Sequence, residues 1–171
     1  MTRMKKILAS SMMITLLCVT ILASFITPQT KAALQGGDAY ALYVTSSLTI
    51  GNGIVNNPVY ITGSGPDGYY AQIYGGNIGD GGAIICEMSS TVPAGSYIAI
   101  YQYSASGYYS GEIVDVSNSS AGPWTEIGSA TISGGPAWTY FTCPVAFTYI
   151  AIVGYDNGIP VNLYIDCVVA V

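Results

Sequence analysis

The side chains that could do chemistry beyond position 31 are carboxylates, tyrosines and cysteines. The sequence contains nine Asp and Glu, four Lys and Arg, and no His, and all four basic residues lie at or before position 31. General bases such as His and amine nucleophiles such as Lys are therefore missing beyond that position. Glu87 and Glu112 could in principle form the carboxylate pair of a glycosidase, but both fall in alternating strand segments, where outward acids are expected. Cys143 has no His partner, so we expect a protein that is not an enzyme.

Several aromatic side chains lie near Gly, Asn and Ser clusters, where turns are expected. Exposed rings can stack on the apolar faces of sugars, and amides or carboxylates can bond to sugar hydroxyls. For every tyrosine the alternative is packing within a β-domain, because all 15 tyrosines lie beyond position 39. The candidate ligand-binding residues are Tyr69, Tyr70, Tyr108, Tyr109, Tyr155, Asp156 and Asn157.

The first 32 residues have the layout of a secretory signal peptide. Arg3, Lys5 and Lys6 precede an apolar stretch over residues 7–23, and a short segment ending in Ala32 follows it. A retained membrane anchor is the alternative, because the apolar run approaches the roughly 20 residues that a spanning helix needs. The Ser and Thr content of the run favours cleavage after Ala32. We therefore expect a protein that is secreted or displayed at the cell surface.

Removal of residues 1–32 would leave a domain without a single basic residue. All four cations would be lost and all nine carboxylates kept, so the formal charge would become −9, against −5 for the whole chain. Nucleic acid and anionic lipid surfaces need Lys or Arg to neutralise phosphates, so neither is an expected partner. A surface wetted by hydroxyls and amides instead suits contact with carbohydrate, a crowded cell wall or a strongly acidic medium.

Beyond the leader, apolar residues alternate with period two between turn clusters, and no long 3.6-residue period occurs. Short strands broken by frequent turns are typical of a β-sandwich or jelly roll. We therefore expect an all-β domain, an antiparallel β-sandwich with jelly-roll topology over residues 54–171, with an N-terminal arm or strand over residues 33–53. The expected strands are residues 39–48, 70–74, 83–88, 96–103, 111–117, 125–132, 137–143, 149–155 and 161–171.

Two of the three cysteines beyond the leader fall on predicted apolar strand faces. Cys86 shares its face with Ile84 and Met88. Jelly-roll topology suggests that its strand and the last strand are neighbours in one sheet, so Cys86 and Cys167 are candidates for a disulfide. The alternative is that both remain buried free thiols. The predicted apolar face of the last strand consists of Leu163, Ile165, Cys167, Val169 and Val171.

Six sequence segments occur in an order that is typical of one family. They are Asn57-Pro58-Val59-Tyr60, then Gly65-Pro66-Asp67-Gly68-Tyr69-Tyr70, then Val114-Asp115-Val116-Ser117 before Trp124-Thr125-Glu126-Ile127-Gly128, and a close over residues 149–153 and 161–166. Together they resemble galactose-binding-like β-jelly-roll domains, the discoidin and carbohydrate-binding-module type of secreted and surface proteins. The superfamily includes sugar-binding, adhesion and structural modules, so the resemblance implies the fold more than the function.

The resemblance also implies a calcium site. In many carbohydrate-binding members a calcium ion ties the loop near the first strands to an acid in the last strand, and Asp67 and Asp166 match these positions. Calcium takes six to eight oxygen ligands at about 2.4 Å, which carboxylates and loop carbonyls supply. The alternative is that Asp67 forms an ordinary Pro-Asp-Gly turn and that Asp166 lies on a solvated strand face.

Two functions remain open at this point. The first is a non-catalytic module that binds an extracellular or cell-wall glycan, with Ca²⁺ as a structural cofactor. The second is a surface-layer, sheath or filament subunit that self-assembles through its β-strand edges. The apolar segment over residues 39–50 motivates the second, because it could complement the sheet of a neighbouring copy.

Overall fold

The computed structural model describes residues 39–156, 158 and 160–171. The predicted signal peptide, the beginning of the predicted arm, and Asn157 lie outside the described residues. Within the described part of the chain, no helix is long and apolar enough to cross a membrane. The described residues form the strands and loops of one β-domain.

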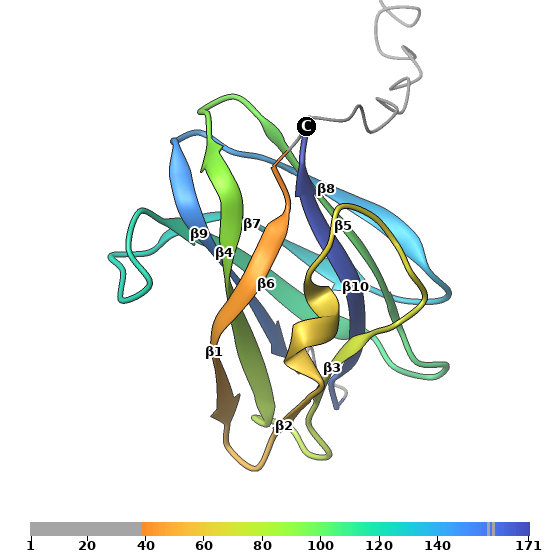
Figure 1. The fold of residues 1–171 in the computed structure, drawn as a ribbon. Helices are drawn as coiled ribbons and strands as arrows, with labels where there is room; N and C mark the ends of the chain where they lie inside the picture. Colours follow the sequence, from red (N-terminus) through yellow and green to blue (C-terminus); the bar gives the residue numbers. More distant parts are fainter. Residues whose placement is uncertain (1–38, 157, 159) are drawn as a thin grey trace, which may run out of the picture. The chain divides into compact units, whose positions relative to one another are not determined.

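The domain consists of two five-stranded antiparallel sheets packed face to face (Figure 1). The first sheet has the order β1 (Ala41–Ile50), β4 (Gly81–Val92), β9 (Phe147–Tyr155), β6 (Ser110–Ser117) and β7 (Thr125–Ile132). The second has the order β2 (Ile54–Asn56), β3 (Ala71–Tyr74), β10 (Asn162–Ala170), β5 (Tyr97–Ser104) and β8 (Ala137–Thr142). A short 3₁₀ helix, η1 (Pro58–Ile61), follows β2. The predicted fold class is confirmed.

The core lies between the sheets and is built by the period-two alternation of apolar residues. Ile84 and Cys86 of β4 face inward beside Ile152 and Ile150 of β9, with which they are in register. The sheets approach closely, since a Cβ added at Gly154 would lie 2.9 Å from Cγ2 of Ile73 on the opposite sheet. Only glycine fits there, because protein interiors are close-packed.

The predicted face of the last strand is wrong beyond Ile165. The register of β10 against β5 shifts between Ile165 and Cys167, so Asp166 is an extra residue in a β-bulge. After the bulge the alternation reverses, and Val168 and Ala170 enter the core in place of Cys167 and Val169. One extra residue therefore moves the rest of the strand's side chains to the other face.

The expectation that Cys86 and Cys167 are neighbours in one sheet is also wrong. Cys86 lies on β4 of the first sheet and points into the core, whereas Cys167 lies on β10 of the second sheet and is not part of the core cluster. Both are buried free thiols, as is Cys143. The predicted disulfide between Cys86 and Cys167 is not formed, because the two strands belong to different sheets and the bulge turns Cys167 outward.

Candidate functional site

The outward face of the second sheet carries a group of aromatic rings. Strand alternation directs Tyr101 and Tyr103 of β5 outward, and the register places them beside Trp138 of β8 and Tyr164 of β10 respectively. Tyr70 approaches from the loop that precedes β3. We call this group the aromatic face; it consists of Tyr70, Tyr101, Tyr103, Trp138 and Tyr164.

The rings of the aromatic face contact one another in defined geometries. Tyr103 and Tyr164 are stacked, with ring centroids 4.6 Å apart and an interplanar angle of 5°. Tyr70 meets Tyr103 edge-on at 5.0 Å, and Tyr101 lies 5.1 Å from Trp138 at a tilt. Such contacts add stability beyond area burial and hold the rings in place. The face therefore presents pre-ordered aromatic surface.

Amide side chains continue the tyrosine row across the sheet. Gln72 of β3 is in register with Tyr164, and Asn56 of β2 is in register with Gln72. Gln72 Nε2 donates to Tyr164 Oη and to Asn162 Oδ1, each at 2.8 Å, and Asn56 Nδ2 donates to Gln72 Oε1 at 2.9 Å. These bonds leave the Tyr164 hydroxyl hydrogen and the Asn162 amide hydrogens for an added partner.

The loop that carries Tyr70 is tied to the sheet by a carboxylate. Asp166 is 1% exposed, and its Oδ1 and Oδ2 accept hydrogen bonds from the backbone N–H groups of Asp67 and Gly68 at 3.0 and 2.9 Å. Asp67 Oδ1 in turn accepts from the N–H of Tyr69 at 2.9 Å. The bulge of β10 thus supplies the acid that positions the loop, and Figure 1 shows this loop passing across β10.

These contacts do not provide the ligand set of a calcium ion. The two oxygens of Asp166 each accept a hydrogen bond from a backbone N–H group, whereas a calcium ion takes six to eight oxygen ligands. Within the described residues, no group of three His, Cys, Asp or Glu is close enough to hold a metal. Asp166 joins the loop over residues 62–70 to β10 through hydrogen bonds from the backbone N–H groups of Asp67 and Gly68, and calcium binding by Asp67 and Asp166 stays a prediction.

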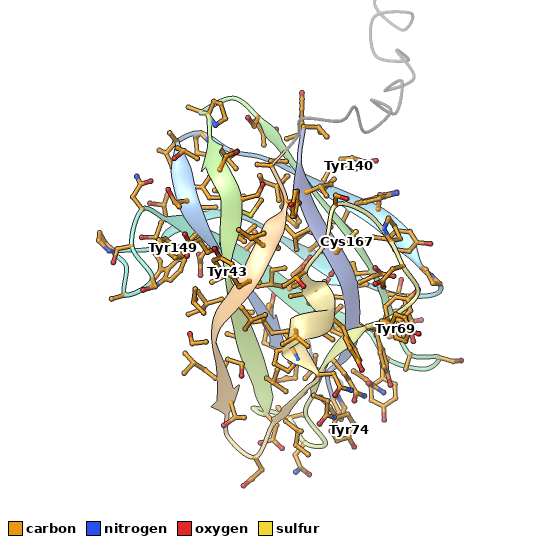
Figure 2. The ribbon with its side chains drawn as sticks, in the orientation of Figure 1. Tyr43, Tyr69, Tyr74, Tyr140, Tyr149 and Cys167 are labelled. Atoms are coloured by element: carbon orange, nitrogen blue, oxygen red, sulfur yellow. The ribbon has the colours of Figure 1, made fainter. Side chains whose placement is uncertain are left out.

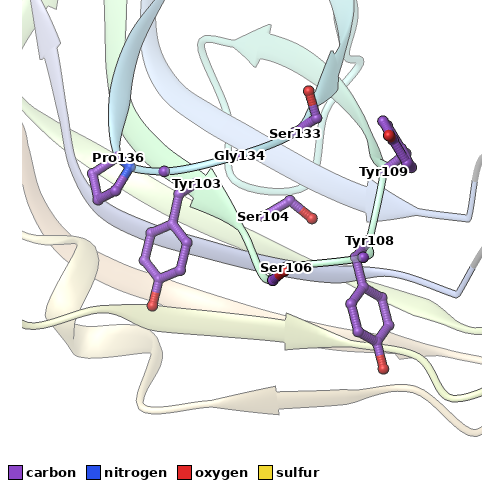
Figure 3. Close-up of a pocket in the computed structure, with 10 residues that line it drawn as sticks. Tyr103, Ser104, Ser106, Tyr108, Tyr109, Ser133, Gly134 and Pro136 are labelled. Atoms are coloured by element: carbon purple, nitrogen blue, oxygen red, sulfur yellow. The ribbon is translucent and has the colours of Figure 1, made fainter.

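An open groove of about 660 Å³ lies at one end of the aromatic face. It separates the β5–β6 turn from the β7–β8 turn, and Tyr103 lines it from the sheet side (Figure 3). Tyr103 and Tyr108 project to the same side of the chain, whereas Tyr109 points away from them. The lining residues carry only hydroxyls, rings and backbone; they are Tyr103, Ser104, Ser106, Gly107, Tyr108, Tyr109, Ser133, Gly134, Gly135 and Pro136.

The predicted ligand-binding residues fall in several places. Tyr70 belongs to the aromatic face, and Tyr69, which is 61% exposed, lies beside it in the chain and packs on Tyr60. Tyr108 and Tyr109 line the groove. The structure therefore places Tyr70 in the aromatic face and Tyr108 and Tyr109 in the groove at the end of that face.

Tyr155 and Asp156 lie elsewhere. Tyr155 is on β9 of the first sheet, where its ring occupies the space that a Cβ at Gly111 would need. Asp156 Oδ2 accepts a hydrogen bond from the N–H of Gly79 at 2.6 Å, which joins two loops. Nothing brings either residue to the aromatic face.

Sequence reasoning missed most of the aromatic face. Tyr101, Tyr103, Trp138 and Tyr164 are strand residues, whereas the rings that the sequence predicts to bind a ligand lie in or beside expected turns. The signal was present, because Tyr101 and Tyr103 alternate with buried residues along β5 and Tyr164 alternates with Leu163 and Ile165 along β10. This alternation indicates that the three rings lie on outward strand faces, but it does not indicate which outward faces are exposed.

No ionisable acid or base belongs to the aromatic face or to the groove lining except tyrosine. Burial raises the pKa of Tyr70 and of Tyr103 above the usual tyrosine value. The hydroxyls therefore remain protonated at neutral pH and can donate hydrogen bonds. The region offers uncharged donors, acceptors and ring faces.

The two glutamates considered as a glycosidase pair lie on opposite faces of the first sheet. Glu112 points into the core, where it is fully buried. Glu87 lies on the outward face, in register with Tyr43 on one side and Tyr149 on the other, and Figure 2 labels both of these tyrosines. Glu87 and Glu112 therefore do not line a common cleft.

No protein-family model matches this chain, and no curated protein matches it in sequence. Among solved structures, the chain is similar to a family 29 carbohydrate-binding module at 13% identity and a TM-score of 0.48, over 77% of this chain and 88% of that one. A mutant of such a module solved with cellulohexaose gives 14% and 0.48, over 78% and 92%. A cleaved adhesin domain of Lys-gingipain gives 12% and 0.47, over 60% and 71%. These proteins are similar to the chain in their β-rich structure alone, and the sandwich of this chain is established by its own two sheets.

Proposed function

We propose that this protein is a non-catalytic module that binds a neutral glycan on the aromatic face. The observation that carries the proposal is the row formed by Tyr103, Tyr164, Gln72 and Asn56 across three adjacent strands and the edge strand β2. It combines stacked rings with amides whose bonding leaves donors free. Sugar recognition requires this combination, because a pyranose presents apolar C–H faces and a rim of hydroxyls.

The charge of the domain supports a neutral ligand. Residues 39–171 contain no Lys, Arg or His, so a uronic acid, a sulfate or a phosphate on the glycan would meet no compensating cation. The fixed carboxylates would instead repel it. Hexose and pentose polymers without acidic groups are the expected class.

Glycan-array or affinity-electrophoresis measurements on residues 33–171 test this proposal. We expect retention by one or more neutral polysaccharides, and loss of retention in Tyr164→Ala and in Gln72→Ala. Tyr43→Ala is the matched control, since Tyr43 is 54% exposed on the other sheet and should leave binding unchanged. Binding to no neutral polysaccharide, or equal loss in the control, would overturn the proposal.

We also propose that the module acts outside the cell, on the strength of the predicted signal peptide. N-terminal sequencing of protein collected from the culture medium or the cell surface tests this. We expect Ala33 as the first residue. Retention of residues 1–32 in a membrane fraction would show that the segment is an anchor.

A second candidate function, self-assembly through strand edges, is favoured by one feature of β1. This ten-residue strand forms one edge of the first sheet and contains no charged residue or proline. Leu42, Tyr43, Leu48 and Ile50 on it are 36–56% exposed. Natural edge strands usually carry charges or prolines that block pairing with another chain.

Light scattering of the secreted protein over a concentration series tests this second candidate. Assembly through β1 should disappear in the double variant Leu48→Lys, Ile50→Lys, while the melting temperature changes little. A monomer at all concentrations would exclude it without bearing on glycan binding.

A further inference from the structure

We propose that the groove beside Tyr103 is a second binding subsite for the same glycan, so that the protein recognises an oligosaccharide chain instead of a single sugar. This inference rests on the proposed function and extends it. The lining of the groove is made only of Tyr, Ser, Gly and Pro.

The groove is continuous with the aromatic face, because Tyr103 belongs to both. Its ring stacks on Tyr164 in the aromatic face and also lines the groove. A glycan lying on the tyrosine row would therefore pass directly into the groove at its Tyr103 end. On the far side, Tyr108 supplies another ring, which projects to the same side of the chain as Tyr103 (Figure 3).

Hydrogen bonds hold one wall of the groove, the β5–β6 turn, in a defined conformation. The β5–β6 turn closes through the N–H of Tyr108, which donates to the carbonyl of Ala105 at 2.9 Å. Gly107 stands at the third turn position with φ of 84°, which is the conformation that a type II turn requires there. The turn is joined to β10 because the N–H of Ala105 donates to the carbonyl of Asn162 at 3.1 Å.

A chain of hydrogen bonds through Ser110 and Asn162 joins Ser104 in the groove to Gln72 beside the aromatic face. Ser104, which lines the groove, is 2.9 Å from Ser110 through their hydroxyl oxygens, and Ser110 Oγ accepts from the N–H of Asn162 at 3.0 Å. The side chain of Asn162 accepts from Gln72 in the aromatic face. The two parts are therefore fixed relative to each other, and preorganisation of this kind lowers the entropic cost of binding a long ligand.

The chemistry of the lining fits a neutral polyol. Serine hydroxyls and turn backbone groups can donate to and accept from sugar hydroxyls, and the groove is open enough to admit a chain. We expect the ligand to be a linear neutral oligosaccharide that contacts Tyr164 and Tyr103 with some of its sugars and Tyr108 with others.

Paired variants test the subsite. The probes are a disaccharide and a hexasaccharide of the neutral polysaccharide that the wild-type domain retains, with Kd measured by titration calorimetry. Tyr108→Ala removes a groove ring. Gly135→Trp places a bulky ring on the groove lining, at a position where an added Cβ meets nothing within 4 Å. Tyr43→Ala and Ser47→Trp on β1 are the matched controls.

We expect both groove variants to weaken hexasaccharide binding about tenfold and to leave disaccharide binding and the melting temperature unchanged. Loss of binding in Tyr164→Ala with full hexasaccharide affinity in both groove variants would overturn the subsite and leave the proposed function standing. If Tyr164→Ala and both groove variants all bind the hexasaccharide with wild-type affinity, the proposed function itself is wrong. Equal weakening by Ser47→Trp would show a nonspecific effect and also count against the subsite.

Discussion

Gln102 and Glu112 face each other in the interior between the two sheets, where Gln102 Nε2 donates a hydrogen bond to Glu112 Oε2 at 2.8 Å. The two side chains are at most 1% exposed. Their remaining oxygens, Gln102 Oε1 and Glu112 Oε1, are both buried without a partner within the described residues. Two buried acceptors without donors are costly, but a proton on Glu112 would convert one into a donor and close a two-bond acid–amide pair.

The first prediction is that the domain is more stable in mild acid than in mild base. Burial raises the pKa of Glu112 to about 7, and the bond from Gln102 lowers it only in part. Because the folded pKa lies above the unfolded value of 4.5, this stabilisation is complete below about pH 4.5 and is lost as the pH rises through about 7. The shift corresponds to roughly 3 kcal/mol, so the melting temperature should fall by about 10 °C between pH 5 and pH 8.5.

Glu112→Gln is the control for this prediction. Two carboxamides can form the same pair of hydrogen bonds at any pH, so the variant should lose most of the slope and be more stable than wild type at pH 8.5. A small slope should remain, since burial also raises the pKa of Asp115. Equal melting temperatures of the wild type at both pH values would show that Glu112 is ionised or hydrated in the native state.

The second prediction concerns the carboxylate that holds the Tyr70 loop. Asp166→Asn keeps the size of the side chain but replaces one acceptor with an NH₂ group that faces the N–H of Asp67 or Gly68. We expect a loss of about 1–3 kcal/mol in unfolding free energy and faster proteolysis within residues 62–70. Glycan binding should weaken too, because the loop positions Tyr70. Asp156→Asn, in a different loop, is the comparison variant and should not expose residues 62–70 to protease.

The strands could be predicted from sequence because their alternation is local. Each of the nine expected strands exists, and that over residues 125–132 has the bounds of β7. The three-residue β2 was missed because so short a segment carries no measurable period. The bulge at Asp166 could not be predicted, since its cause lies in the register with β5 and in loop amides 98 or 99 residues away in sequence.

The aromatic face was hidden for a related reason. Alternation shows that Tyr103 and Tyr164 share the outward side of their strands, but it does not show which outward faces a loop covers. Cys167 and Val169 also point outward and are nevertheless buried. Asp166, the residue before Cys167, holds the loop over residues 62–70, and Val169 forms a β-bridge with Tyr40. Only the tertiary structure separates the covered half of the face from the half that a ligand can reach.

The third prediction is that calcium has no effect on the domain. Hydrogen bonds to Asp166 already tie the loop over residues 62–70 to β10, so we expect calcium to add no stability at this place. The melting temperature and the glycan affinity should be the same in a chelator and in millimolar calcium. A calcium-dependent rise in melting temperature that magnesium does not reproduce, and that Asp67→Asn removes, would contradict this prediction.

The fourth prediction is that the domain contains three unreactive thiols. Burial raises the pKa of Cys86 and of Cys167 to about 12, so the reactive thiolate is scarce. Mass spectrometry after alkylation should detect no labelled cysteine in the native domain and three in denaturant without reductant. A reductant should leave the melting temperature unchanged. Labelling of only one cysteine in denaturant would reveal a disulfide.

The fifth prediction follows from the absence of cations in residues 39–171. Binding through stacking and neutral hydrogen bonds releases no counterions. The Kd for a neutral oligosaccharide should therefore stay constant when the salt concentration is raised far enough to screen interactions between charges. The matched probe is the same oligosaccharide with its sugars oxidised to uronic acids. We expect it to bind at least tenfold more weakly at low salt, with part of the loss recovered at high salt as the repulsion is screened. Equal or tighter binding of the uronic acid would mean that a cation or a metal contributes to the site.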